Sequence, residues 1–348
     1  MSKEESIDLL SLLKDVLKTK KVNEVSTILN VANGTVKRWI DLEKVPSAYC
    51  FDLMKLANIP IDYSKFTSKE KDQFYTPKST AEYCYKKILE IIRQYGDNED
   101  DYVFIEPSAG NGNFLKVLPP TRRIGIDVEP RNDEIIKCDY LTWNPEVENQ
   151  KYIVLGNPPF GLRGQLALKF INHSQPFADY VCFILPQLFE SDGKGVPRKR
   201  VIGYNLVHSE KINSVFYDPS KKEVKVECIF QLWSKHHVNP KYIIKTLDDS
   251  IIKVYSLSDG GSPSSTRNKK MFYKCHAYLP STCFGKDNMR YYSSFDELPK
   301  RRGYGIVFQK DKEKNINKCK NLKWHNIAFL STNSAYNLRS SQIISQFD

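Results

Sequence analysis

Hydrophobic residues recur at helical spacing through the first sixty residues of the chain. The pattern predicts four helices, over Ile7–Leu17, Glu24–Asn30, Val36–Leu42 and the residues that follow Pro46. A tight turn is expected at Asn33–Gly34, with Thr35 capping the third helix and Ser47 capping the fourth. Residues 1–62 are therefore predicted to form a helical module, and the polar residues 63–73 a linker.

From residue 74 the hydrophobic pattern changes to short apolar runs that alternate with helical stretches. The candidate strands are Val103–Glu106, Ile124–Asp127, Tyr152–Leu155, Tyr180–Leu185 and Lys225–Leu232, and a helix is expected over Ser79–Ile92. Strands and helices that alternate in this way predict an α/β domain over residues 74–235, with a mostly parallel sheet covered on both faces. Residues 236–348 lose this rhythm, are basic and rich in aromatic residues, and are expected to contain short strands.

Composition limits the kinds of protein that the chain can be. Of its 348 residues 41% are hydrophobic and 27% charged, and no apolar run is long enough to cross a bilayer. The start lacks the apolar stretch of a signal peptide, so we expect a cytoplasmic protein, or a nuclear one in a eukaryotic host. The eight cysteines show no C-x-x-C spacing, which favours reduced thiols and no metal site. The net charge of +11 suits a polyanionic partner such as nucleic acid.

The most informative motif is the tetrapeptide Asn157-Pro158-Pro159-Phe160, which follows the apolar strand Tyr152–Leu155 after one glycine. Two prolines fix φ at successive positions and stiffen the chain at the end of the strand, where open α/β sheets bind ligands. The Asn157 Oδ1 and the Pro158 carbonyl can accept the two hydrogens of a base amino group and favour its nucleophilic form. Phe160 can stack on an extruded base.

A second group of motifs precedes this tetrapeptide. The strand Phe104–Glu106 enters a turn with Gly110 and Gly112, and glycine lets the backbone approach a ligand closely. We expect a helix after this turn. Asp127 ends the next strand, where a carboxylate can accept hydrogen bonds from ribose hydroxyls, and Asp139 supplies a further carboxylate.

In this order the motifs resemble the amino-methyltransferases of nucleic acids, whose signature is Asp/Asn/Ser-Pro-Pro-Tyr/Phe/Trp. The resemblance covers residues 74–235, matches the circular order called the gamma class, and implies S-adenosylmethionine as methyl donor. Gln73–Pro77 is similar to the family motif that closes over the methionine moiety, and Asp139 to the residue that contacts the adenine amino group. The implied cofactor residues are Tyr75, Thr76, Pro77, Glu106, Ser108, Ala109, Gly110, Asn111, Gly112, Asp127, Val128, Asp139, Tyr140 and Asn157. The implied catalytic residues are Asn157, Pro158, Pro159 and Phe160.

Two basic segments are candidate nucleic-acid contacts. Val25–Ile40 resembles a helix-turn-helix of the repressor type, in which Thr35, Lys37 and Arg38 would face the major groove. A basic loop after the strand Tyr180–Leu185 carries Lys194, Arg198, Lys199 and Arg200, which could meet phosphates. The plainer interpretations are a small helical bundle with a solvated basic helix and a solvated charge run.

The sequence thus predicts a helix-turn-helix module, a Rossmann-like methyltransferase core and a C-terminal α+β target-recognition region. The predicted reaction is methyl transfer to N6 of adenine in double-stranded DNA, with base flipping and direct in-line transfer. N4 of cytosine and N6 of adenine in RNA stay open as alternatives, as does a non-catalytic DNA-binding subunit. A restriction endonuclease is a candidate partner, and the oligomeric state is not predicted.

Overall fold

The computed structural model describes residues 7–147, 149–191, 196–243, 250–261, 265–331 and 334–347. The chain divides into two compact units, Met1–Gln73 and Phe74–Asp348. In the described residues the α-helices are α1 (Leu9–Thr19), α2 (Val22–Ile28), α3 (Asn33–Asp41), α4 (Cys50–Leu56), α5 (Lys78–Gln94), α6 (Gln165–His173), α7 (Lys312–Asn321), α8 (Trp324–Ile327) and α9 (Ser340–Ile344).

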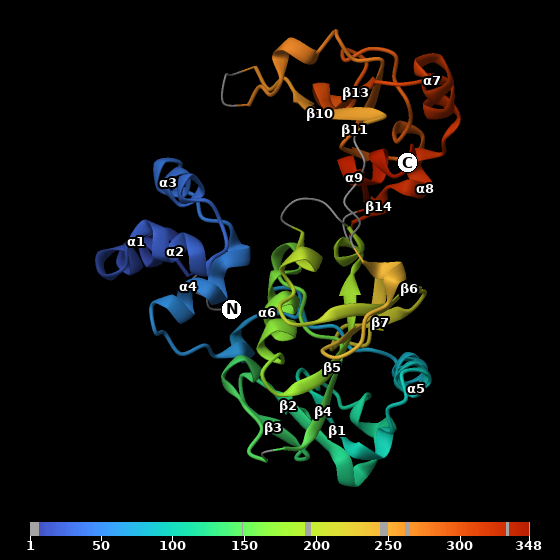
Figure 1. Cartoon of the computed structure of the whole chain (residues 1–348). Helices are drawn as coiled ribbons and strands as arrows, with labels where there is room; N and C mark the ends of the chain where they lie inside the picture. Colours follow the sequence, from blue (N-terminus) through green and yellow to red (C-terminus); the bar gives the residue numbers. More distant parts are fainter. Residues whose placement is uncertain are drawn as a thin grey trace. The chain divides into compact units, whose positions relative to one another are not determined.

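The strands all belong to the second unit (Figure 1). They are β1 (Tyr102–Glu106), β2 (Arg123–Asp127), β3 (Ile135–Lys137), β4 (Lys151–Gly156), β5 (Ala178–Pro186), β6 (Asn205–Ile212), β7 (Val215–Tyr217), β8 (Glu223–Lys225), β9 (Cys228–Ser234), β10 (Ile252–Ser258), β11 (Ala277–Pro280), β12 (Thr282–Phe284), β13 (Arg302–Phe308), β14 (Phe329–Leu330) and β15 (Ala335–Asn337).

The first unit is a small helical bundle in which a short turn joins α2 to α3. The turn lies at residues 29–32, where Asn30 adopts a φ of +52°. Asn33 and Gly34, predicted as the turn, instead begin α3, and Thr35 lies within the helix rather than at its cap. Because Asn30 takes the left-handed conformation, the chain reverses before Gly34.

Two further details of this unit differ from the sequence prediction. Ser47 begins a 3-10 turn that precedes α4, with Pro46 at the cap. Residues 63–73, expected as a linker, include the 3-10 turn Tyr63–Lys65, and Phe66 packs against the core of the bundle. The compact unit accordingly extends to Gln73.

The second unit is built on a seven-stranded sheet of order β3-β2-β1-β4-β5-β9-β6. The neighbours from β3 to β5 are parallel, whereas β9 is antiparallel to both β5 and β6. The predicted mostly parallel sheet is confirmed. The expected strand Lys225–Leu232 is divided between β8, which pairs with β7, and β9, which enters the large sheet.

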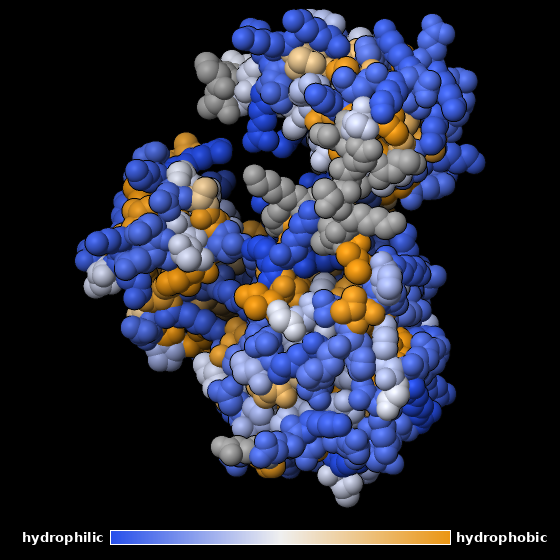
Figure 2. All heavy atoms as spheres, in the orientation of Figure 1, coloured by the Kyte–Doolittle hydropathy of each residue, from blue (hydrophilic) through white to orange (hydrophobic). Residues whose placement is uncertain are grey.

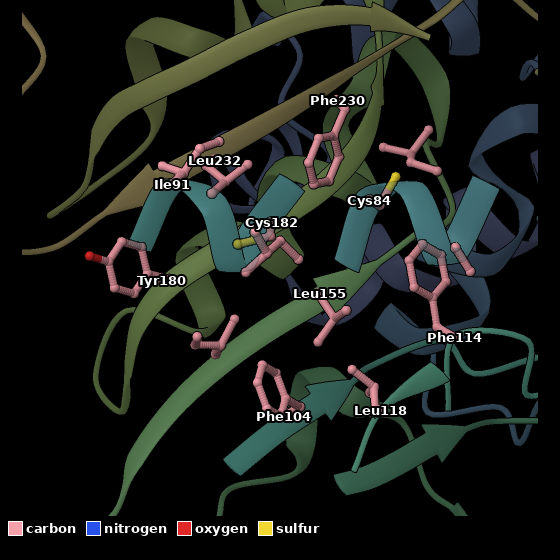
Figure 3. Close-up of a cluster of buried hydrophobic side chains, with 14 of the residues drawn as sticks. Cys84, Ile91, Phe104, Phe114, Leu118, Leu155, Tyr180, Cys182, Phe230 and Leu232 are labelled. Carbon is pink, nitrogen blue, oxygen red and sulfur yellow. The ribbon is translucent and has the colours of Figure 1, made fainter. Parts of the chain in front are cut away.

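Alternate residues of β5 face two separate hydrophobic cores. Cys182 and Ile184 pack with α5 on one face, and Val181 and Phe183 pack with α6 on the other. Figure 3 shows the α5 side, where Cys84 and Ile91 of the helix lie over apolar side chains of the strands. This arrangement explains why β5 reads as a continuous apolar run, since both of its faces are buried.

The connection from β1 to β2 contains no α-helix, contrary to the prediction for the residues after Gly112. Gly110 and Gly112 both have positive φ, and only the 3-10 turns Leu115–Val117 and Pro120–Arg122 follow. Pro119 and Pro120 cannot continue a helix, so too few residues separate Gly112 from Pro119 for more than one turn. The Gly-rich segment is therefore a loop that packs directly against the end of the sheet.

The residues after the large sheet form smaller sheets of order β10-β13-β11 and β12-β15-β14. These strands surround a hydrophobic core of their own, with Trp324 and Ile306 among its buried members. Short strands with helices agree with the expected α+β character of this region. On the face drawn in Figure 2 most exposed residues are hydrophilic, and the hydrophobic residues form separate patches.

Candidate active site

The motif residues meet at the carboxyl edge of the parallel strands. In the register of the sheet Glu106 at the end of β1 lies beside Gly125 of β2, and Ile105 lies beside Val154 of β4. The loops that leave β1, β2 and β4 therefore begin at one edge. This edge of an open α/β sheet is where ligands usually bind.

The Gly-rich loop after β1 is held by the carboxylate of Asp127. Asp127 Oδ2 accepts the Gly110 N–H at 2.8 Å, and its Oδ1 accepts the Glu129 N–H at 2.7 Å. The Tyr75 ring lies so close to Gly110 that a Cβ there would stand 3.1 Å from a ring carbon, and Gly110 has a φ of +52°. A side chain at this position would be both strained and crowded, which explains the glycine.

Asp127 is only 9% exposed, yet each of its oxygens retains a lone pair after accepting one backbone N–H. Its geometry allows two roles, the positioning of the loop and the acceptance of hydroxyl hydrogens from a ligand. The sequence predicted the acceptance of hydroxyl hydrogens. It did not predict the positioning of the loop, because every residue except proline has a backbone N–H and the sequence does not show which one contacts Asp127.

Glu106 is a buried carboxyl group behind the same loop. It is 2% exposed, and its Oε2 accepts the Leu115 N–H at 3.1 Å. Burial raises the pKa of Glu106 well above its usual range, an effect that the Leu115 hydrogen bond opposes and the neighbouring Asp127 reinforces. A cationic group of a ligand would favour the ionised form.

The tetrapeptide Asn157–Phe160 follows β4 directly, and its Asn side chain has an unusual environment. Asn157 Oδ1 is buried, and no described residue donates a hydrogen bond to it. The Ser108 Oγ donates to the Asn157 backbone carbonyl at 3.2 Å and so joins the loop after β1 to the loop after β4. Buried polar atoms are almost always paired, and an unpaired oxygen at the edge of the sheet where ligands usually bind is a candidate acceptor for a donor from a ligand.

Phe160 closes the tetrapeptide with an aromatic ring between the two cores. It is half-buried and packs partly against the hydrophobic clusters on both faces of the sheet. Its backbone carbonyl accepts the Leu166 N–H at 3.0 Å, which ties the tetrapeptide to the start of α6. The partial exposure leaves some of the ring for contact with another planar group.

The segment Tyr75–Pro77 joins the site from the start of α5. Tyr75 exchanges two backbone hydrogen bonds with Tyr217 of β7, and Pro77 lies at the cap of α5. Asn113 Nδ2 donates to the Thr76 carbonyl at 2.8 Å, which fastens this segment to the Gly-rich loop. Asn113 was not singled out from the sequence, although its place directly after Gly112 is a signal that could have drawn attention to it.

Asp139 and Tyr140 differ in what they can offer to a ligand. Asp139 is half-buried, and its side chain accepts the Leu141 N–H at 3.1 Å. The Tyr140 side chain is 1% exposed and shares a 2.7 Å hydrogen bond with the Ser174 hydroxyl, within the core beside α6. Tyr140 can therefore contribute to a ligand site only through its main chain. Val128 is half-buried directly after Asp127.

The predicted basic loop is described only in part, because Lys194 lies outside the described residues. Lys199 is exposed, whereas the Arg198 guanidinium donates to the Tyr242 carbonyl. Arg200 donates to Gln165 Oε1 at 3.1 Å, and its Nε and Nη2 are buried with no described partner. Burial lowers the pKa of Arg200. Lys199 is thus the most accessible to phosphate of the three described residues.

In α3, Lys37 and Arg38 are exposed and Thr35 is half-buried. Val36 and Trp39 are buried and anchor α3 in the bundle. Among the described residues no helix is long and apolar enough for a membrane span, and no group of three His, Cys, Asp or Glu side chains could hold a metal ion.

No family model matches the chain, and no curated protein matches its sequence. Parts of several solved structures resemble it. A protein from Pyrococcus horikoshii assigned to the RNA methyltransferases is 20% identical over 47% of this chain and 86% of its own, with a TM-score of 0.33. A structure from a type I restriction–modification system is 11% identical over 68% of this chain and 61% of its own, with a TM-score of 0.33.

The type IIL restriction–modification enzyme MmeI, solved in complex with DNA, is also 11% identical. The alignment covers 74% of this chain and 50% of MmeI, with a TM-score of 0.33. The chain thus spans about half the length of that enzyme. Alignments at this level assign neither a family nor a reaction to the chain.

Proposed function

We propose that this protein is an S-adenosylmethionine-dependent methyltransferase that acts on the exocyclic amino group of a nucleic-acid base. The observation that carries the proposal is the buried, unpaired Oδ1 of Asn157 at the carboxyl edge of the sheet. An amino hydrogen of a base is a donor that would satisfy this oxygen. The Pro158 carbonyl, next in the chain, is a candidate acceptor for the second amino hydrogen.

Some residues at the carboxyl edge of the sheet would bind the cofactor, and others would orient the base. Asp127 and the loop Ser108–Gly112 would hold the cofactor, and Glu106 would lie behind its methionine end. The cofactor supplies an electrophilic methyl group on a sulfonium. Asn157 would orient the amino nitrogen in line with that methyl group, so that the N–C bond forms as the S–C bond breaks. The proton would then leave the methylated nitrogen to water.

Phe160 would hold the extruded base by stacking, while Asn157 holds its amino group. Catalysis of this kind depends on positioning and on polarisation of the amino group. We favour N6 of adenine in double-stranded DNA because Asn stands at the first position of the tetrapeptide and a helix-turn-helix precedes the sheet. The same geometry would serve N4 of cytosine or adenine in RNA.

One experiment distinguishes these substrates. The full chain is incubated with methyl-labelled cofactor and, separately, with duplex DNA and folded RNA of mixed sequence, and the labelled nucleoside is identified after digestion. We expect labelled N6-methyladenine from duplex DNA. Labelled N4-methylcytosine or labelled RNA would correct the substrate, and no label on any nucleic acid would overturn the proposal.

The helix-turn-helix leads to a prediction for α3. The double substitution Lys37→Gln with Arg38→Gln should weaken duplex DNA binding and lower the slope of log affinity against log salt by about 2, one for each phosphate that the variant no longer neutralises. A salt titration followed by fluorescence anisotropy measures this slope. The matched control is Lys14→Gln with Lys18→Gln, which removes two exposed charges from α1. Equal slopes for both variants would assign α3 another role.

The raised pKa of Glu106 leads to a pH prediction. The pKa of Glu106 in the folded protein is raised well above the usual glutamate value of 4.5. In the pH interval between these two pKa values, the free protein therefore holds a proton on Glu106. A cationic cofactor favours the carboxylate, so binding should release this proton and the affinity should rise as the pH rises through the interval. Calorimetry in two buffers of different ionisation enthalpy measures the released proton. Glu106→Gln should abolish the release, and an unchanged release in that variant would contradict the assignment.

A further inference from the structure

The positive charge of the chain is concentrated in its last third. Residues 236–348 contain 19 Lys and Arg against 9 Asp and Glu, a net charge of +10, whereas residues 1–235 have a net charge of +1. A charge excess that is spread evenly only keeps a protein soluble. An excess confined to one region produces a local positive potential that attracts a polyanion.

Within this region the lysines gather on and beside α7. The lysines of residues 310–323 are all exposed: Lys310, Lys312, Lys314, Lys318, Lys320 and Lys323. The acidic residues of the same segment are Asp311 and Glu313. None of these lysines forms an ion pair with a described residue. The segment therefore presents a net positive surface whose charges are not neutralised within the described chain.

The inner side of α7 fixes this helix to the C-terminal core. Cys319 is fully buried, and Asn315 is 8% exposed with its Nδ2 donating to the Lys310 carbonyl at 3.0 Å. The buried Trp324 donates its indole N–H to the Cys319 carbonyl at 2.8 Å. Because these contacts hold one side of the helix, the residues on the other side keep a constant orientation.

The outer side of α7 is a polar ridge of residues three and four apart: Lys314, Asn317, Lys318 and Asn321. Two aromatic rings restrain one lysine of this ridge and one lysine next to it. Lys318 Nζ lies 5.3 Å from the centre of the Phe347 ring, and Lys320 Nζ lies 5.5 Å from that of Tyr291. Ammonium groups restrained in this way lose less side-chain entropy when they bind a phosphate.

We propose that the outer ridge of α7 binds the phosphate backbone of duplex DNA, with Lys314 and Lys318 as the principal contacts. The inference deepens the proposed function by naming the surface that holds the substrate, and it rests on DNA being that substrate. Phosphate contacts of this kind supply affinity and orientation, and they do not depend on sequence. Methyl transfer itself takes place at Asn157.

The test compares two double variants that remove the same charge from the full chain. Lys314→Gln with Lys318→Gln changes the ridge, and Lys86→Gln with Lys151→Gln removes exposed lysines from α5 and from the first residue of β4. Binding to a mixed-sequence duplex is measured by anisotropy between about 50 and 200 mM salt. The ridge variant should lower the slope of log affinity against log salt by about 2, and the control should leave it unchanged.

The proposal would be overturned by an unchanged slope in the ridge variant or by an equal decrease of the slope in both variants. It would also be overturned if the ridge variant lost affinity only for RNA or for phosphatidylserine vesicles, which are used as competing anions. Circular dichroism melting shows whether each variant is folded. If the ridge variant is not, the single substitutions Lys314→Gln and Lys318→Gln replace it, each with an expected decrease of about 1. A wild-type chain that binds DNA through the ridge without methylating it would overturn only the proposed function.

Discussion

Asn157→Ala should lower the single-turnover rate of methyl transfer by about 100- to 1000-fold at saturating cofactor and DNA. Asn157 Oδ1 is buried and accepts no hydrogen bond from a described residue, and in the proposed mechanism its donor is the base amino group. Its interaction strengthens as positive charge develops on the nitrogen, so the loss belongs to the transition state. Removal of one such prearranged hydrogen bond typically costs about 2.7–4 kcal/mol.

The stability of this variant provides the control. Within the described chain the Asn157 side-chain oxygen accepts no hydrogen bond, so the melting temperature should stay close to that of the wild type. Asn157→Asp retains an acceptor at the same position and should recover much of the rate. A wild-type rate in Asn157→Ala would refute the amino-methyltransferase mechanism.

Asp127→Ala should weaken binding of S-adenosylmethionine and of its demethylated product by about 1.5–3 kcal/mol, or roughly 10- to 150-fold. The substitution would remove the carboxylate that accepts hydrogen bonds from the ribose hydroxyls in the proposed complex. The substitution would also leave the Gly110 N–H without the Asp127 Oδ2 acceptor that lies 2.8 Å away. Isothermal titration calorimetry measures both affinities, and Asp133→Ala removes an exposed carboxylate from the same segment as the control.

A cofactor analogue without ribose hydroxyls separates the two roles of Asp127. If Asp127 contacts the ribose, the wild type should prefer the natural cofactor to the analogue, and Asp127→Ala should lose that preference. If Asp127 only positions the Gly-rich loop, the substitution should weaken both ligands equally. Unchanged affinity for every ligand in a folded variant would remove Asp127 from the site.

Local patterns in the sequence were sufficient to predict the central strands and α5. Each buried strand is a short apolar run bounded by polar residues, and α5 (Lys78–Gln94) extends the predicted helix Ser79–Ile92 by a few residues. Because three of the motifs follow parallel strands, their meeting at one edge could also be expected. The structure brings together Glu106, Asp127 and the start of the tetrapeptide there.

Other features depend on contacts that have no local signature. The short β3 and the half-exposed β6 lack a sustained apolar run, and the antiparallel position of β9 follows from its partners in the sheet. Tyr140 was inferred from a motif position, whereas its burial against Ser174 depends on α6. The two backbone hydrogen bonds of Asp127 likewise appear only when the strands are paired.

The separate hydrophobic cores have a consequence for how such a protein can diversify. The buried residues of the large sheet lie between Ala81 and Trp233, and those around Trp324 lie between Ile252 and Phe347. Few core positions in one group constrain the choice of residues in the other. Recombination that exchanges residues 250–347 can therefore bring in a new surface while most of the packing of the large sheet is retained, provided that the Leu330 N–H donor to Gln187 Oε1 is kept.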